Sequence, residues 1–286
     1  MNSKFAEVFN EMKKNKGAMI GLGLIIFFFL LAIFAPLISP YSPEKVTNQF
    51  SIPPMWVESG SSTFIFGTDD VGRDLLSRII YGSRISMLYG LLVVLLSVSV
   101  GTILGVIAGF YGGLIDQQIM RLVDVLMALP SILLAIVIMA ILGPGVGNAI
   151  IAVSIVAVPS FIRIVRASVL QEKKKQYVIA ASSYGASSFR LMFVEILPNC
   201  MAPLIVQASL CFSDGILNTA ALGFLGLGAQ PPTPEWGTML ADSRAFIESS
   251  PWMVTIPGIC ILLVVLAFNL LGDGLRDVLD PKLKKS

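Results

Sequence analysis

Six charge-poor apolar runs constrain what this chain can fold into more than any other feature of its sequence. A helix needs about 20 apolar residues to cross the hydrocarbon core of a bilayer, and all but the fourth run approach that length. A water-soluble fold of 286 residues that is 55% hydrophobic and 13% charged could not bury so much apolar surface. We therefore predict an all-α polytopic membrane protein with six transmembrane helices, in Gly17–Ile38, Ile85–Phe110, Ile119–Leu142, Ala149–Ile162 (extended to Leu170), Met201–Leu222 and Trp252–Leu271.

The placement of lysine and arginine predicts the orientation of these helices. With the N-terminus inside, fifteen of these residues fall in inner segments and five fall outside. Cytoplasmic loops of membrane proteins carry such an excess of positive charge. Both termini are therefore expected in the cytoplasm. The first helix is expected to remain uncleaved, because no small-residue cleavage site precedes a soluble domain.

The segments between the helices divide the chain further. Proline and glycine in the second outer segment (Pro231, Pro232 and Pro234 among them) exclude a continuous helix there. The expected organisation is an inner N-terminal segment (1–16), a first helix (17–38), an outer segment (39–84), a core of five helices (85–271) and an inner C-terminal tail (272–286). Within that core lie an inner loop (171–199) and an outer loop (223–251).

The inner loop combines polar and small residues. Tyr177–Tyr184 is expected to form a short helix, which breaks at Gly185 because glycine permits a sharp turn. Ser187 or Ser188 can cap a second helix, and Pro198 is expected to end this segment before the next membrane helix. An ordinary pair of amphipathic interfacial helices is the alternative interpretation.

The order of residues in this loop resembles the EAA loop of ABC-importer permeases, which docks onto a separate ATPase subunit. The resemblance assigns docking to Ala180, Ala181, Tyr184, Gly185, Leu197 and Pro198. Ile179 stands where that family usually has glutamate, so we expect the contact to rest on shape. Further segments resemble the peptide and nickel group of the family, namely Phe66–Asp74, Gly112–Pro130, Gly223–Gly237 and Asn269–Lys282.

The resemblance implies a type I ABC-importer permease architecture in the bacterial inner membrane, with the outer side facing the periplasm. It implies a homologous second permease subunit, two ABC ATPase subunits and a periplasmic substrate-binding protein as partners. The cargo would be dipeptides, with oligopeptide, glutathione, haem or chelated nickel as alternatives. No cofactor is expected in this chain, because ATP and Mg would be bound by the partner subunits; the sequence itself has no phosphate-binding G-x-x-x-x-G-K-[ST] loop.

Three polar residues in the fifth run are candidates for the translocation path. Gln207, Asp214 and Asn218 are spaced i, i+7, i+11 and share one helical face. An acid at this depth is costly and usually faces a bundle interior or a wet cavity. Asp214 therefore either makes a hydrogen bond in helix packing or lines the path.

Charged residues in the first outer segment form a second candidate site. Asp69, Asp70, Arg73 and Asp74 could contact a periplasmic partner or could pair locally at the start of the second helix. Trp236, in the second outer loop, belongs either to a rigid cap or to an outer gate. On the inner side, Arg121 and Asp124 are expected to pair along one helix.

Other functional classes have little support. The chain contains no histidine, and we predict neither a metal site nor catalytic residues. Its net charge of +2 gives no reason to expect a nucleic-acid partner. A self-sufficient secondary transporter is disfavoured because the sequence shows no internal repeat and few ionisable groups within the membrane runs.

Overall fold

The computed structural model describes residues 11–279, and every regular element in that part is a helix. The predicted terminal segments lie in part outside it, since residues 1–10 and 280–286 are not described. Five helices are long, namely α2 (Lys16–Ile33), α4 (Leu75–Tyr111), α7 (Val146–Glu172), α10 (Met201–Phe224) and α12 (Trp252–Leu279). The shorter ones are α3 (Ala35–Ile38), α5 (Gly113–Met127), α6 (Ser131–Leu142), α8 (Gln176–Ser183), α9 (Ser188–Arg190) and α11 (Trp236–Ser243).

The third predicted membrane helix is broken. α5 and α6 meet at 95°, with a break over residues 128–130. Pro130 lacks an amide hydrogen and disfavours the helical conformation in the residue before it, which explains the break. The continuous helix predicted over Ile119–Leu142 is therefore wrong. The described part contains five helices that are long and apolar enough to span a membrane, or six if the bent pair is one span.

The second membrane helix begins ten residues earlier than predicted. α4 starts at Leu75, and the side chain of Asp74 caps it by accepting a hydrogen bond of 2.8 Å from the Ser77 amide. The expected start at Ile85 assumed that Arg78 and Arg84 lie outside the helix. Both lie within it. The boundary at 84 between the outer segment and the membrane stays a prediction.

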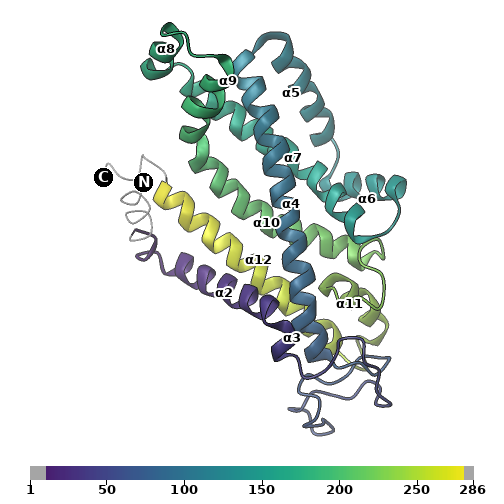
Figure 1. Ribbon diagram of the computed structural model, residues 1–286. Helices are drawn as coiled ribbons and strands as arrows, with labels where there is room; N and C mark the ends of the chain where they lie inside the picture. Colours follow the sequence, from purple (N-terminus) through teal and green to yellow (C-terminus); the bar gives the residue numbers. More distant parts are fainter. Residues whose placement is uncertain (1–10, 280–286) are drawn as a thin grey trace.

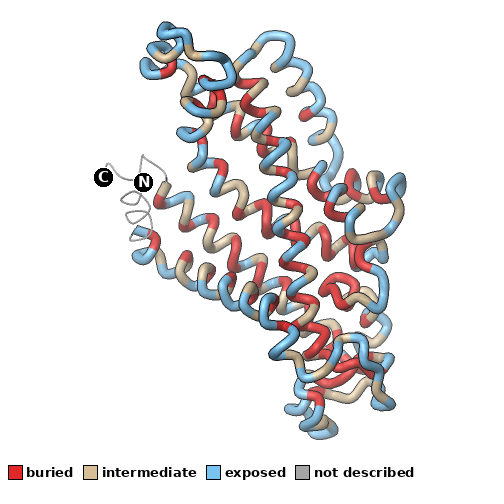
Figure 2. Tube along the Cα trace, in the orientation of Figure 1, coloured by how far each residue is buried: buried red, intermediate tan, exposed pale blue. Residues whose placement is uncertain are grey.

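α4 runs through the centre of the bundle (Figure 1) and packs against α2, α7 and α10, while α12 packs between α2 and α10. Buried residues follow the inward faces of these helices, and α5 is mostly exposed (Figure 2). α8 lies at one end of the bundle, and the 39–74 segment lies at the opposite end (Figure 1).

A row of glycines allows α4 and α7 to approach closely. Three glycines one turn apart on α4 face three larger side chains one turn apart on α7, namely Gly101, Gly105 and Gly109 against Phe161, Val165 and Val169. A Cβ at Gly105 would lie 2.7 Å from the Cβ of Val165. Small residues at such spacing permit the close backbone contact that membrane helices use for packing.

Two ion pairs connect α5 to α7. Arg166 binds Asp116 through two nitrogens, with 2.6 Å between Nη2 and Oδ2. Arg163 binds Asp124 at 2.8 Å. The predicted pair between Arg121 and Asp124 is therefore wrong: Asp124 pairs across helices.

Candidate functional site

The loop of residues 171–199, called the docking loop below, largely has the predicted local structure. α8 occupies Gln176–Ser183, Gly185 follows with φ of +81°, and the Ser187 side chain accepts a hydrogen bond from the Arg190 amide. Glycine suits this turn because other L-residues are strained at positive φ. The expectation that Pro198 ends the segment is wrong. The chain stays helical through a π turn and a 3₁₀ turn into α10, because a proline in the first turn of a helix loses no required hydrogen bond.

The six residues predicted to dock lie together in this loop, and most of them are accessible. Tyr184 is 93% exposed, and Ala180, Gly185 and Pro198 are also exposed, while Ala181 and Leu197 are half-buried. Nothing lies within 4 Å of where a Cβ on Gly185 would stand. The buried side chain of Val178 anchors α8 from its other face. The loop therefore presents an accessible surface on which Ala180 and Gly185 are small and Tyr184 projects.

Tyr177 links the docking loop to the helices on either side of it. Its hydroxyl donates to Glu172, at the end of α7, over 2.9 Å and accepts from Asn199, just before α10, over 3.1 Å. Lys175 also donates to Glu172 at 2.6 Å. Burial and the hydrogen bond to Glu172 raise the pKa of Tyr177 to about 12, so the phenol stays protonated and able to donate. The sequence did not reveal this network, because it joins residues 22 positions apart.

Two of the cavities that α10 lines contain residues of the predicted site. We call the larger of these the mouth cavity; it has a volume of about 570 Å³ and is lined by α7, α10 and α12. Glu172 and Asn199 belong to its wall. The second, the polar cavity, has a volume of about 330 Å³ and brings together all three residues predicted for the path. Gln207 lines both cavities, and Asp214 and Asn218 line the polar cavity. The mouth cavity thus touches the network of Tyr177.

Asp214 is exposed at the polar cavity. Among residues 11–279 its side chain has no hydrogen bond or ion pair, and only its backbone carbonyl accepts one, from Asn218 over 2.8 Å. Of the two interpretations left open by the sequence, lining of the path is therefore favoured over a packing hydrogen bond.

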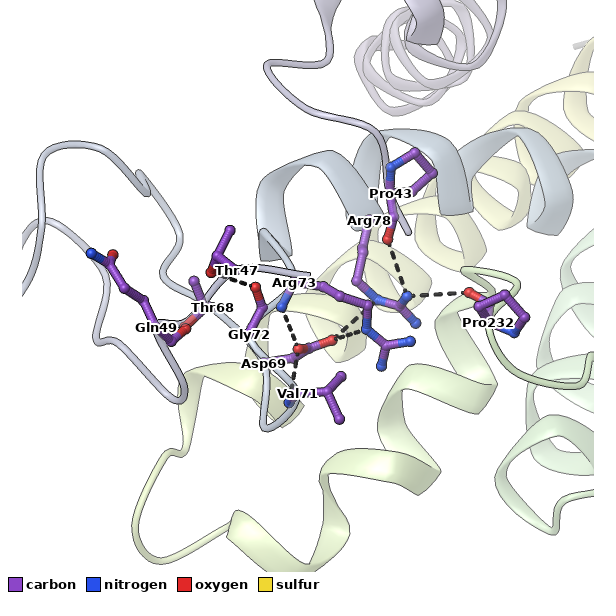
Figure 3. A network of polar contacts seen from close by, with 10 residues as sticks. All are labelled: Pro43, Thr47, Gln49, Thr68, Asp69, Val71, Gly72, Arg73, Arg78 and Pro232. Carbon is purple, nitrogen blue, oxygen red and sulfur yellow. Dashed lines mark hydrogen bonds and ion pairs between the residues drawn. The ribbon is translucent and has the colours of Figure 1, made fainter. Parts of the chain in front are cut away.

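At the opposite end of the bundle, Asp69 is the centre of a buried polar network (Figure 3). It accepts from Arg73 Nε at 2.6 Å, and its Oδ2 lies 3.6 Å from Arg78 Nε. Arg78 also donates to the carbonyls of Pro43 and Pro232, at 3.4 and 3.3 Å (Figure 3). The network therefore ties both outer segments to the start of α4.

These contacts favour a local structural role for most of the predicted outer site. Asp69, Arg73 and Asp74 are buried, whereas Asp70 is half-buried and has no hydrogen bond within residues 11–279. A contact with a periplasmic partner stays a prediction for these four residues, and in this conformation Asp70 is the most accessible of them.

Trp236 is fully buried at the start of α11. Its indole nitrogen donates to the carbonyl of Ile79 at 3.2 Å, and its ring packs against Phe28 with centroids 5.7 Å apart. The neighbouring Glu235 caps α11 by accepting from the amides of Gly237 and Thr238, each at 2.8 Å. Burial raises the pKa of Glu235, and these hydrogen bonds oppose the rise. These contacts favour the rigid cap over the outer gate for Trp236, and either role stays a prediction. Glu235 was missed by the sequence interpretation.

No group of three metal-ligating side chains occurs in the part of the chain that the structure describes. The residues predicted for docking and for the path lie on an accessible loop and on two cavities lined by α10, and a hydrogen-bond network joins the loop to the larger cavity.

Comparison with known proteins places these features in a family. Residues 101–285 match the family model described as binding-protein-dependent transport system inner membrane component. Residues 3–54 match the N-terminal TM domain of oligopeptide transport permease C.

Full-length relatives are also similar to this chain. It is 57% identical over 280 residues to a dipeptide transport system permease protein of Escherichia coli (strain K12), covering 98% of this chain and 93% of that protein. It is 53% identical over 274 residues to the dipeptide permease of Haemophilus influenzae, covering 96% and 93%. A glutathione transport system permease protein of Pectobacterium atrosepticum is 44% identical over 266 residues, covering 93% and 87%.

Among solved structures, a chain of the MetNI methionine ABC transporter has a similar fold. The TM-score is 0.57 at 18% identity, and the match covers 71% of this chain and 97% of that one.

Proposed function

The chain belongs to the family of binding-protein-dependent transport system inner membrane components, and on that premise we propose that it forms half of the translocation pathway for dipeptides. As a member of this family it is the permease component of an ABC importer in the inner membrane. It is not an enzyme and needs no cofactor, because the ATPase of the transporter binds ATP. A substrate-binding protein and an ATPase are its partners.

The observation that carries the proposed coupling mechanism is the continuous contact between the docking loop and the mouth cavity. The loop presents its accessible surface to the ATPase. Tyr177 joins α8 to Glu172 and Asn199, and both of these residues line the mouth cavity. A displacement of α8 on ATP binding would therefore move the wall of the cavity, and the bundle would alternate between outward and inward access.

A second, homologous permease chain would complete the pathway. The bent pair α5–α6 supports this, because large apolar side chains on both helices are uncovered: Leu114 is 76% exposed, Val125 66% and Ile141 80%. Lipid or protein must cover such a surface in a membrane. We propose that the second permease covers part of it, that two ATPase subunits bind below, and that both termini lie in the cytoplasm.

Dipeptides are the proposed cargo because the relatives at 53% and 57% identity are dipeptide permeases over almost their full length. Glutathione is the second candidate, since the glutathione permease is 44% identical. Oligopeptide is a third candidate, because residues 3–54 match the N-terminal TM domain of oligopeptide transport permease C. Haem and chelated nickel are not favoured by a specific observation.

Reconstitution tests the proposal. The complete transporter is placed in liposomes with the binding protein outside and ATP at the ATPase side, and uptake of labelled dialanine is measured against competing glutathione and pentaalanine. We expect ATP-dependent dialanine uptake that glutathione does not compete for. Uptake of glutathione in preference to dialanine would overturn the cargo assignment, and uptake without ATPase subunits would overturn the coupling.

A further inference from the structure

The polar cavity has an unusual distribution of charge. Its wall includes one ionisable carboxylate, Asp214, and neither lysine nor arginine. The other hydrogen-bonding side chains that line it are neutral, namely Ser131, Ser160, Gln207 and Asn218. Its formal charge is therefore negative.

Most of these polar groups are unpaired. Among residues 11–279, the side chains of Asp214, Ser160 and Gln207 make no hydrogen bond, and Asn218 uses its amide nitrogen for the carbonyl of Asp214. An unpaired carboxylate inside a membrane bundle is costly and is usually found where a substrate or a partner charge completes it. The volume of about 330 Å³ is in the range of small-molecule sites.

We propose that Asp214 is the binding site for the protonated amino terminus of the transported peptide. This rests on the proposed function, since it takes the polar cavity to be part of the peptide's path. A dipeptide at neutral pH carries an ammonium at one end and a carboxylate at the other. An ammonium entering a medium of low dielectric needs an opposite charge and hydrogen-bond acceptors, and Asp214 supplies the charge. The hydroxyl of Ser160 and the amide oxygen of Gln207 supply acceptors from α7 and α10.

This assignment also orients the peptide. The carboxylate end cannot lie beside Asp214 without repulsion, so the amino end enters the polar cavity and the carboxylate end points away from it. Recognition then depends on the charged amino group and tolerates changes at the carboxyl end.

The test measures binding to the complete transporter in lipid nanodiscs, without binding protein and without nucleotide. Equilibrium dialysis compares dialanine, N-acetyl-dialanine and dialanine amide. We expect the first and third ligands to bind at least about tenfold more tightly than the second, the factor that one charge-assisted hydrogen bond contributes. Asp214→Asn should remove this preference and Asp214→Glu should largely keep it. Glu248→Gln, which removes an exposed acid that lines neither cavity, is the matched control and should keep it fully.

Asn218→Lys gives a second variant in case Asp214→Asn does not assemble. It leaves the carboxylate in place and puts a competing ammonium one helical turn away, so it should also remove the preference. Equal binding of free and acetylated dialanine by the unmodified transporter would overturn the inference, as would a preference that survives in Asp214→Asn or Asn218→Lys. Dialanine uptake by the unmodified transporter, measured separately, tests the proposed function. Normal uptake together with an unchanged preference in Asp214→Asn would reject only the role of Asp214.

Discussion

Gly185→Glu provides the most informative test of the docking loop when it is compared with Gly185→Ala. Gly185 has φ of +81°, and there is open space around the position of a Cβ. Any other L-residue there carries a strain of roughly 1–2 kcal/mol, and both variants share this cost. A difference in ATPase affinity between the two variants therefore reports contact between residue 185 and another protein.

The size of that difference follows from the exposed position of the turn. In the free chain the glutamate side chain would stand in water, so its charge has little effect on folding. Against a docked ATPase it would be an unpaired buried charge, which costs at least about 3 kcal/mol. Because each 1.4 kcal/mol is tenfold in affinity, ATPase binding should weaken by more than about a hundredfold. Gly185→Ala should weaken it by less than about tenfold, the effect of strain alone.

Titration of purified ATPase onto the permease in nanodiscs gives the two affinities, and thermal unfolding of the same samples gives the shared strain. Both variants should unfold at similar temperatures. Wild-type affinity in Gly185→Glu would refute the assignment of the loop. Equal weakening in both variants would show that backbone strain, and not contact, explains the effect.

Three further predictions follow from contacts within the chain. Tyr177→Phe should lower the peptide transported per ATP hydrolysed by about fivefold or more, which is the usual scale of coupling energies. Tyr111→Phe, which removes an exposed hydroxyl, should not change this ratio. An unchanged ratio in Tyr177→Phe would contradict the role of the network in coupling. Gly105→Ala should destabilise the chain by about 1–3 kcal/mol in a denaturation experiment through overpacking of α4 on α7, whereas Gly23→Ala, in open space on α2, should not. Glu235→Ala should lower the free energy of unfolding by about 1–3 kcal/mol because it leaves buried amides of α11 unpaired. Glu235→Gln should lower it less. Equal stability of wild type and Glu235→Ala would contradict the capping role.

The long helices could be predicted from the sequence because their apolar composition has few structural alternatives. The start of α4 could not, because the prediction began the helix after the last charged residue of the outer segment, and Arg78 precedes that point. Its charge is satisfied by Asp69 and by two carbonyls from segments far apart in the sequence. The break between α5 and α6 was missed for a different reason: the prediction treated Ile119–Leu142 as one apolar run and did not use Pro130 as a helix break.

The candidate site was only partly visible in the sequence. Helical spacing alone places Gln207, Asp214 and Asn218 on one face, and the structure puts all three on one cavity. The link from Tyr177 to Asn199 depends on how α8 packs against the π turn at Leu191–Ile196, which no periodicity encodes. The glycine row on α4 could have been found from its four-residue spacing, but its partner helix could not.

Photo-crosslinking from the docking loop tests the central claim most directly. Tyr184, 93% exposed, is replaced by benzoylphenylalanine in the assembled transporter, and Trp56, 61% exposed in the segment at the opposite end of the bundle, is replaced in a matched variant. The account predicts a crosslink to the ATPase subunit from position 184 and none from position 56. A crosslink to the ATPase from position 56, or its absence from position 184 in a transporter that still hydrolyses ATP, would contradict the account.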